Sequence, residues 1–207
     1  MRLVKEMKVL AVGAHPDDIE LGAGASISKH EKTGDLVHFL ILSFGEKSGN
    51  KTDRKIEAWK SAQILKVKSL TFGHLPDTMI SSGIETITVI ENLINKIKPD
   101  RIYTQSPKDR HQDHRNTAYA TFSAARRMKE VLCYESPDSY PDFVPQYFVK
   151  LNAKALSQKI EALHQYGSQK GKAFLEKKAI RGLASFRGYQ IGVLYAEAFE
   201  VARIIDV

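Results

Sequence analysis

The chain has 207 residues, of which 43% are hydrophobic and 27% charged, which suits one α/β domain of ordinary size that buries its own core. Its single cysteine, Cys133, excludes an internal disulfide and a cysteine-rich zinc site, and its net charge of +7 is spread along the whole chain, which disfavours nucleic acid as a partner. No apolar run approaches the roughly 18 residues that a membrane span needs, and Met1–Lys8 lacks the apolar core of a signal peptide, so we expect no membrane span and a cytoplasmic location.

Short apolar runs alternate with helical patterns from the first strand to about residue 136. We expect strands over residues 9–13, 36–43, 69–72, 101–104 and 131–134. We expect helices over residues 19–32, 52–65, 85–98 and 114–129, the first ending at Gly34 and the second capped by Thr52 or Asp53. This alternation predicts an α/β fold, namely a Rossmann-like, doubly wound, mostly parallel sheet with helices on both faces.

The pattern changes after Pro137, where three prolines within nine positions predict a loop crossing or a lid. Beyond it we expect an edge strand over residues 148–151, a helix over 153–166, and a mixture of helix and extended chain over 172–207. We expect a single domain over residues 1–207, with a core of residues 1–136 and a C-terminal extension, residues 137–207, that completes the fold and its pocket.

Three ionisable residues, His15, Asp17 and Asp18, directly follow the first predicted strand. Burying a histidine and two carboxylates is costly unless they are paired or bind a metal. The C-terminal edge of a parallel sheet is also where open α/β folds bind their ligands. Pro16 restricts the backbone between these residues, so we expect His15 and Asp18 to lie rigidly on one side of the turn.

A second cluster, with His111, Asp113 and His114, follows the fourth predicted strand. Its two histidines are three positions apart and share one face if a helix begins there. In a sheet of strand order 3-2-1-4-5, the first and fourth strands are neighbours, so the two clusters would face each other across one crevice. The sequence therefore predicts one site built from both clusters.

The residue types in these clusters suit a catalytic zinc ion, which takes three protein ligands and keeps one open position. Another divalent ion, such as Fe²⁺, suits the same nitrogen and oxygen donors. Because Asp17 and Asp18 are adjacent, we expect at most one of them to face the metal directly. The other is then the candidate general base, which takes a proton from water.

The sequence His-Pro-Asp-Asp at residues 15–18, with His-x-Asp-His at residues 111–114, resembles the LmbE-like, PIG-L superfamily of zinc-dependent N-deacetylases. The resemblance extends over most of the chain, including Arg54 and residues 75–77, 166–169 and 192–199. The last of these segments is most similar to the bacillithiol-type bacterial branch. Each motif alone is weakly specific, and the combination is what identifies the superfamily.

By position, the resemblance implies that His15, Asp18 and His114 hold one zinc ion per chain. It implies that Asp17 is the general base. It also implies that His111 stabilises the oxyanion of the reaction and protonates the leaving amine.

The same resemblance assigns roles to three residues around this centre. Asp113 would orient His111 by a hydrogen bond to its second ring nitrogen, as a further catalytic residue. Arg54 resembles a substrate-contacting arginine, and Arg110, which lies beside the site, would anchor an anionic group of the substrate.

The implied activity is removal of an acetyl group from the amide nitrogen of an N-acetylglucosamine-type sugar or conjugate, by metal-activated water. The resemblance also implies a homo-oligomer, a trimer or a hexamer. Two positions depart from the family pattern, because Gln112 stands in place of a proline and Thr78 in place of a glycine. We expect the second departure to change the acceptor pocket.

Other interpretations compete with these assignments. Asp17 is also a good helix N-cap, and Arg54 and Arg110 could be solvent-exposed residues without a role in binding. Trp59 has helical spacing with Ile56, which favours core packing. As a whole, the chain could be a non-catalytic sugar- or nucleotide-binding Rossmann-like module, or a nucleic-acid-binding protein whose affinity falls steeply with salt.

Overall fold

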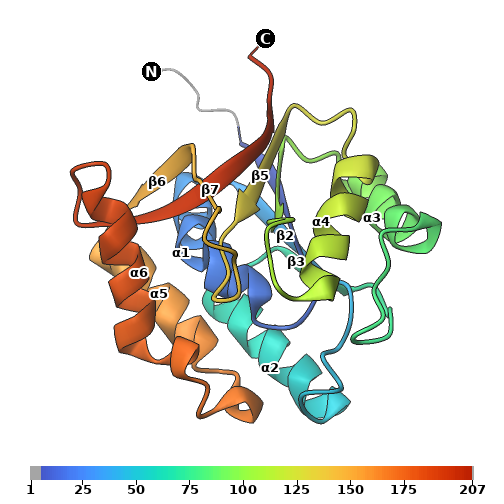
Figure 1. The fold of residues 1–207 in the computed structure, drawn as a ribbon, viewed down its shortest axis with the longest axis horizontal. Helices are drawn as coiled ribbons and strands as arrows, with labels where there is room; N and C mark the ends of the chain where they lie inside the picture. The colour runs from blue at the N-terminus through green and yellow to red at the C-terminus, as the bar shows by residue number, and fades with distance from the viewer. Residues whose placement is uncertain (1–5, 207) are drawn as a thin grey trace.

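The computed structural model describes residues 6–206, and residues 1–5 and Val207, the ends of the expected domain, lie outside it. Its centre is a seven-stranded sheet of order β3-β2-β1-β4-β5-β7-β6 (Figure 1). The strands are β1 (Lys8–Gly13), β2 (Leu36–Ile41), β3 (Ser69–Phe72), β4 (Arg101–Gln105), β5 (Glu130–Tyr134), β6 (Tyr147–Leu151) and β7 (Tyr195–Ile204).

The first five strands are parallel and follow the predicted order 3-2-1-4-5. The extension then adds two strands to the same sheet, since β7 pairs antiparallel with both β5 and β6. The predicted edge strand is confirmed as β6. The long strand β7 enters between β5 and β6, so the chain's last segment lies inside the sheet and not at its margin.

Helices cover both faces of the sheet, which confirms the predicted fold class. On one face α1 packs against α5, and α5 packs against α2, while α3 and α4 pack together on the other face (Figure 1). Their bounds are α1 (Asp18–Thr33), α2 (Lys51–Ile64), α3 (Ile84–Ile97), α4 (Gln112–Ala124), α5 (Ala153–Leu163) and α6 (Lys177–Tyr189), with single 3₁₀ turns η1 (Gly167–Gln169) and η2 (Ala173–Leu175).

Most helix ends fall within a few residues of the prediction, and their caps explain the differences. Helix α1 ends at the predicted Gly34, whose left-handed φ of 86° a glycine adopts without strain. The predicted cap of α2 is wrong, because the Asn50 side chain accepts from the backbone N–H groups of Thr52 and Asp53. Helix α4 begins two residues before the predicted His114, because the His111 side chain caps it.

The prediction that Trp59 packs in the core is wrong, since this residue is 43% exposed. The buried face of α2 is formed by Arg54 and by small residues such as Ala58 and Ala62. Cys133 is buried as predicted, and burial raises the pKa of its thiol. Tyr195 is half-buried and packs against the apolar core, and it does not line the crevice beside His15 and His114.

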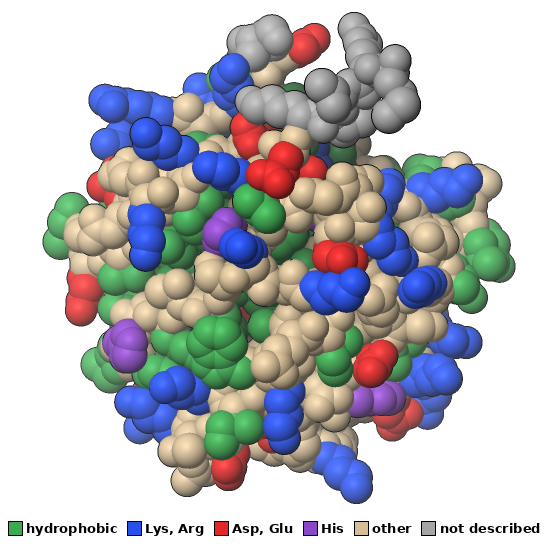
Figure 2. Space-filling view, turned by 180° about the vertical axis from the view of Figure 1, so that it is seen from behind, with side chains coloured by type: hydrophobic (Ala, Val, Ile, Leu, Met, Phe, Trp, Pro, Cys, Tyr) green, Lys and Arg blue, Asp and Glu red, His purple; other side chains and the backbone are tan. Residues whose placement is uncertain are grey.

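Among residues 6–206, no helix is both long enough and apolar enough to cross a membrane. Figure 2 shows lysine and arginine side chains scattered over one face of the molecule, between apolar and acidic ones. On that face the positive charge forms no continuous stripe of the kind that follows a nucleic acid backbone.

Candidate active site

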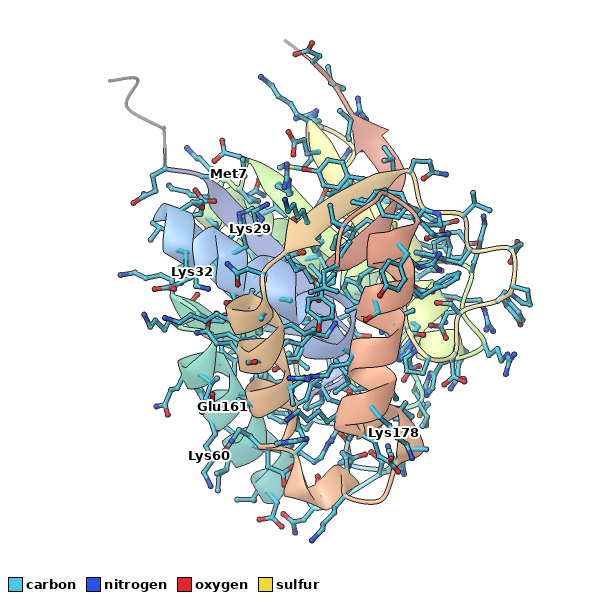
Figure 3. The ribbon with its side chains drawn as sticks, turned by 90° about the vertical axis from the view of Figure 1, so that its left-hand side faces the viewer. Met7, Lys29, Lys32, Lys60, Glu161 and Lys178 are labelled. Atoms are coloured by element: carbon cyan, nitrogen blue, oxygen red, sulfur yellow. The ribbon has the colours of Figure 1, made fainter. Side chains whose placement is uncertain are left out.

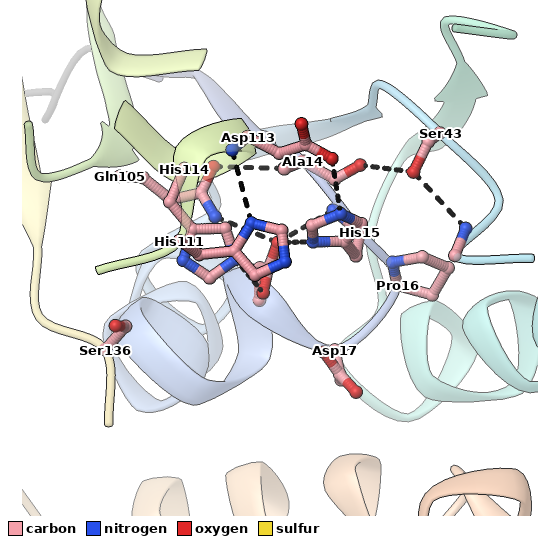
Figure 4. Close-up of polar contacts among 12 residues, drawn as sticks. Ala14, His15, Pro16, Asp17, Ser43, Gln105, His111, Asp113, His114 and Ser136 are labelled. Carbon is pink, nitrogen blue, oxygen red and sulfur yellow. Dashed lines mark hydrogen bonds and ion pairs between the residues drawn. The ribbon is translucent and has the colours of Figure 1, made fainter. Parts of the chain in front are cut away.

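Three buried side chains converge at the carboxyl ends of β1 and β4. His15, Asp18 and His114 each place one donor atom within 4.8 Å of the other two. His15 Nδ1 lies 3.3 Å from Asp18 Oδ2, and His114 Nε2 lies 3.3 Å from Asp18 Oδ1. Figure 4 shows the neighbouring rings of His15, His111 and His114. The fold therefore brings together the three residues that the sequence predicts as metal ligands.

The other ring nitrogen of each histidine faces a carboxylate. His15 Nε2 lies 3.1 Å from both Asp77 Oδ1 and Asp113 Oδ2, while His114 Nδ1 lies 3.0 Å from Asp109 Oδ2. Histidines that bind metals commonly have a carboxylate against the far ring nitrogen. His15 Nε2 hydrogen-bonds to Asp113, whereas the contact of His114 Nδ1 with Asp109 is an ion pair without hydrogen-bond geometry. The contacts leave His15 Nδ1 and His114 Nε2, the two nitrogens beside Asp18, to act as donors toward an ion.

Asp18 is held in place by two neutral donors. Its Oδ2 accepts from the backbone N–H of His15 at 2.7 Å and from Gln105 Nε2 at 2.9 Å. Gln105 is the last residue of β4 and also accepts from Ala14 N, so it links the two strand ends that carry the clusters. The carboxylate is thus oriented before any ligand binds.

Buried negative charge dominates this site. The carboxylates of Asp17, Asp18, Asp77, Asp109 and Asp113 are all buried here. Burial lowers the pKa of His114, but the Asp18 charge and the contacts with Asp109 and Asp18 outweigh it and raise the pKa to about 9. Burial opposes ionisation of Asp18, yet the His114 charge and the hydrogen bonds from both histidines hold its pKa well below the usual range.

These observations fit a bound divalent cation. A surplus of buried carboxylates is costly unless a positive charge balances it. The donor set of two imidazole nitrogens and one carboxylate leaves room for a further ligand, as in catalytic zinc centres. The residues that would hold the ion are His15, Asp18 and His114.

Asp17 has an unusual backbone at the start of α1. Its φ of 94° and ψ of −24° are rarely adopted by a residue with a side chain, and such outliers concentrate at functional sites. Its carboxylate makes no capping hydrogen bond to α1, so the interpretation of this side chain as a helix cap is wrong. Burial raises the pKa of Asp17 to about 7, although the Arg54 charge opposes that shift.

Arg54 holds the turn that carries Asp17. Its Nη2 donates to the Pro16 carbonyl at 2.7 Å, and its Nη1 donates to Asp17 Oδ2 at 3.3 Å. The side chain is only 2% exposed. Gly45 leaves the space for it, because a Cβ at that position would lie 2.9 Å from Arg54 Nη2. Arg54 borders the cavity, but its charged group is engaged with the protein itself.

His111 is fixed in one tautomer by the start of α4. The backbone N–H of Asp113 donates to His111 Nδ1 at 3.2 Å, so in the neutral ring the proton is on Nε2. The His111 ring stacks on that of His114, with centroids 4.7 Å apart. Burial and the charges of His114 and His15 lower the pKa of His111, which favours this neutral form.

The Asp113 carboxylate contacts His15, and not His111 as predicted. Its Oδ2 faces His15 Nε2 and accepts from Thr78 N, and its Oδ1 accepts from Ile80 N. The prediction that this carboxylate orients His111 is therefore corrected. The reason is that Asp113 sits in the first turn of α4, where its side chain is directed back toward β1 and the 76–80 loop.

A cavity of about 240 Å³ opens beside these groups. Its lining includes His15, Asp17 and His111, together with two basic residues at its mouth, Lys47 and Lys172. Part of the wall, residues 136–138 and Phe174, comes from the end of the core and from the C-terminal extension. Arg110, predicted to anchor a substrate anion, is exposed and lies outside this lining.

The sequence interpretation assigned no role to Asp77, Asp109 or Gln105. Asp109 opens the cluster of residues 109–114 and Asp77 follows a family-like proline, so both carried a weak signal. Gln105 carried none, because a glutamine at a strand end is common. Only contacts across the sheet edge reveal what these three side chains hold.

Comparisons with known proteins show the family of the chain. Residues 10–125 match the PIG-L family model, described as GlcNAc-PI de-N-acetylase. The uncharacterized deacetylase YaiS of Escherichia coli (strain K12) is 32% identical over 79% of this chain and 92% of its own. The diacetylchitobiose deacetylase of Thermococcus kodakarensis is 28% identical over 92% of this chain and 81% of its own.

Two further similarities bear on fold and reaction. The crystal structure of the conserved protein TT1542 from Thermus thermophilus has a TM-score of 0.88 and 23% identity, covering 97% of both chains, which shows a shared fold. A 4-oxalmesaconate hydratase from Pseudomonas putida is 27% identical over 53% of this chain and 48% of its own. From its family-model match and its 32% identity to a deacetylase, the chain belongs to the PIG-L family of de-N-acetylases.

Proposed function

We propose that this protein is a zinc-dependent hydrolase that removes an acetyl group from the amide nitrogen of an N-acetylglucosamine-type sugar or conjugate. One observation carries the proposal: three buried donors, a buried carboxylate and a histidine of fixed tautomer border one cavity. The family supports N-deacetylation as the reaction class.

Each residue then has a role that its contacts support. His15, Asp18 and His114 hold the ion, with Asp77, Asp113 and Asp109 against the far nitrogens of the two histidines. When bound, zinc supplies Lewis acidity to a water molecule and to the acyl carbonyl. Another divalent ion such as Fe²⁺ could fill the same role.

Asp17 is the general base. It takes a proton from water as the water oxygen forms a bond to the carbonyl carbon. Arg54 fixes the carboxylate at the cavity wall, so we assign this arginine a positioning role in place of direct substrate contact. The pKa of about 7 is suitable for a base that must also release its proton in each turnover.

His111 acts on the other side of the reacting carbonyl. The Nε2–H of this neutral ring can donate a hydrogen bond to the developing oxyanion. The proton that Asp17 took from water then goes to the amine nitrogen as the carbon–nitrogen bond breaks, in place of the direct protonation by His111 that the resemblance implies. A neutral His111 that gave up this proton would become an anion. Acetate and a free amino sugar are the products, and the transfer leaves Asp17 ionised and His111 neutral, as at the start of the reaction.

The remaining proposals come from the sequence and the family. We propose a single domain over residues 1–207, in which residues 137–207 complete a core of residues 1–136. We further propose a cytoplasmic homo-oligomer, a trimer or a hexamer, acting on a small N-acyl amino sugar without nucleic acid. The bacillithiol-type branch and a role of Arg110 in anchoring an anion stay predictions.

Two other functions compete. A non-catalytic sugar- or nucleotide-binding module needs neither Asp17 nor His111, whose presence beside the three donors disfavours it. A hydratase is the second candidate, because one relative carries that name and the same groups could add water to a double bond. The two reactions differ in product, since only the deacetylase releases an amine.

The test combines metal content with activity. The protein is purified without added metal, bound zinc and iron are quantified, and amine release from N-acetylglucosamine, diacetylchitobiose and related conjugates is measured. About one ion per chain and metal-dependent amine release support the proposal. Failure to bind any divalent ion under several conditions would sink it, while bound metal with hydration of an unsaturated acid but no amine release would favour the hydratase.

A further inference from the structure

A second cavity, of about 160 Å³, adjoins the active-site cavity. It lies between α1, α6, β7 and the segment that follows β5. The two cavities have four lining residues in common, namely Leu21, Ser136, Pro137 and Phe174. A substrate held at the catalytic groups therefore has this second space beside it.

The free surface of the second cavity is mostly apolar. Helix α6 contributes four apolar residues to it, namely Ala179, Ile180, Leu183 and Ala184. Lys178, the residue before Ala179, is labelled in Figure 3 and marks this part of α6. Leu21 on α1 lines both cavities and so continues this apolar surface toward Asp17 and Asp18 at the start of that helix.

The charged residues of the lining are paired with one another. Lys159 Nζ donates to Glu197 Oε1 at 2.7 Å and to the Leu21 carbonyl. Arg187 makes two hydrogen bonds to the Glu135 carboxylate, at 2.9 Å and 2.5 Å. None of the side chains described in this lining has a buried polar atom without a partner. The four charged side chains of the lining are thus engaged with protein groups and not with a ligand.

The cavity is also open to solvent along α6. Ala179 is exposed, and Leu183 is 38% exposed. An apolar space that water can enter gains free energy when an apolar group displaces the water. This accessibility distinguishes the cavity from a closed packing defect in the core.

We propose that this cavity is a subsite for an alkyl or aryl substituent of the amino-sugar substrate. The substituent is either an N-acyl chain longer than acetyl or an apolar group on the anomeric carbon of the sugar. The inference rests on the proposed function, since it extends the substrate of that same site.

The experiment uses two substrate series with the zinc-loaded protein. One lengthens the N-acyl chain of glucosamine from acetyl to butyryl and hexanoyl, and the other lengthens the anomeric group of N-acetylglucosamine from methyl to butyl and hexyl. In the series that reaches the cavity, kcat/KM should rise about fourfold for each added methylene that is buried. The series that responds identifies the source of the apolar group.

Two variants on α6 tie the effect to the cavity. Ala179→Trp fills the mouth of the cavity and should remove the chain-length dependence while leaving turnover of N-acetylglucosamine at the wild-type level. Lys178→Trp is the matched control, because its side chain is 85% exposed and does not line the cavity. This control should keep the full chain-length dependence.

Failure of this inference is distinguishable from failure of the proposed function. Turnover of N-acetylglucosamine with a flat response in both series would overturn the subsite and keep the deacetylase. If no substrate is turned over, calorimetric binding of two pairs decides the point: the methyl and hexyl N-acetylglucosaminides, and N-acetyl- and N-hexanoylglucosamine. At least tenfold tighter binding of the longer compound in either pair, abolished by Ala179→Trp, supports the subsite, and equal binding within both pairs overturns it.

Discussion

Two histidine–carboxylate clusters lie at opposite ends of the parallel strands, one at their amino ends and one at their carboxyl ends. At the amino-terminal edge His30 is saturated, since its Nδ1 faces Asp35 Oδ2 at 2.7 Å and its Nε2 faces the Tyr103 hydroxyl at 3.0 Å. At the carboxyl edge His15 and His114 each use only one nitrogen in this way, and their other nitrogens meet at Asp18. Residue types alone do not distinguish the two clusters.

The difference between the clusters is charge balance. Arg101 donates to the Tyr103 hydroxyl, which completes a chain of neutral and paired groups at the amino-terminal edge. There burial is the dominant effect and lowers the pKa of His30. At the carboxyl edge the surplus of carboxylates raises the pKa of His114 to about 9. A polar cluster that satisfies itself is structural, whereas one that leaves charge and donors uncompensated is prepared for a ligand.

The largest expected effect separates the two histidines. His114→Ala should lose stoichiometric metal and reduce kcat/KM by about 10⁴-fold, because the ion contributes several kcal/mol to the transition state. His30→Ala should keep about one ion per chain. Elemental analysis measures the metal content of both variants, and the amine-release assay measures their kcat/KM. Loss of metal in the His30→Ala variant would contradict the distinction between a structural and a metal-binding cluster.

Asp17→Asn tests the general base. Because the amide cannot take a proton, kcat should fall by about 10²- to 10⁴-fold while the metal content stays at the wild-type level. Steady-state kinetics together with elemental analysis checks this. If the metal-loaded Asp17→Asn variant kept wild-type activity, the assignment of Asp17 as the general base would be wrong.

The two carboxylates that face a histidine Nδ1 form a matched pair. Asp109→Asn weakens the hold on His114 and should lower metal affinity by about 10- to 100-fold. Asp35→Asn alters the same kind of contact at the other edge and should leave metal affinity unchanged. Competition with a chelator of known affinity measures both, and equal effects in the two variants would contradict the distinction.

The two arginines provide a smaller contrast. Arg54→Lys keeps the positive charge, but a lysine cannot make both of the hydrogen bonds that the guanidinium donates to Pro16 and Asp17. We therefore expect kcat to fall about tenfold with little change in KM. Arg101→Lys should leave both constants unchanged. A rise in KM without a change in kcat would instead favour direct substrate contact by Arg54.

The smallest effect concerns stability and pH. His30→Asn should lower the free energy of unfolding by about 1–2 kcal/mol at pH 8, through the lost contacts with Asp35 and Tyr103. Because folding lowers the pKa of His30, the stabilisation is complete above the unfolded pKa of about 6.5 and is lost as the pH falls below it.

The difference between wild type and the His30→Asn variant should therefore shrink on acidification. Urea denaturation between pH 5 and pH 8 measures it at both ends of this range. His164→Asn is the control, since His164 is exposed, and it should change stability little at any pH. A stability penalty that grows as the pH falls would contradict a lowered pKa of His30 in the folded protein.

The sequence by itself determined the sheet order of the first five strands, the two polar clusters and their meeting at one edge. These features depend on local periodicity and on the rule that parallel strands end together, both of which a single sequence expresses. It also predicted the family, because two motifs at the right separation are specific. The error at Trp59 shows the limit, since helical spacing does not say which face of α2 is buried when that face is built from Arg54 and small residues.

Only the tertiary structure decided which carboxylate faces which histidine, that Arg54 is buried against Asp17, and that α6 and β7 border a second cavity. These contacts join residues distant in the chain, such as Asp113 with His15 and Lys159 with Glu197. Their geometry follows from strand register and helix packing, which no local pattern encodes. The placement of β7 between β5 and β6 is of the same kind, because pairing energy depends on the neighbouring strands and not on the strand's own sequence.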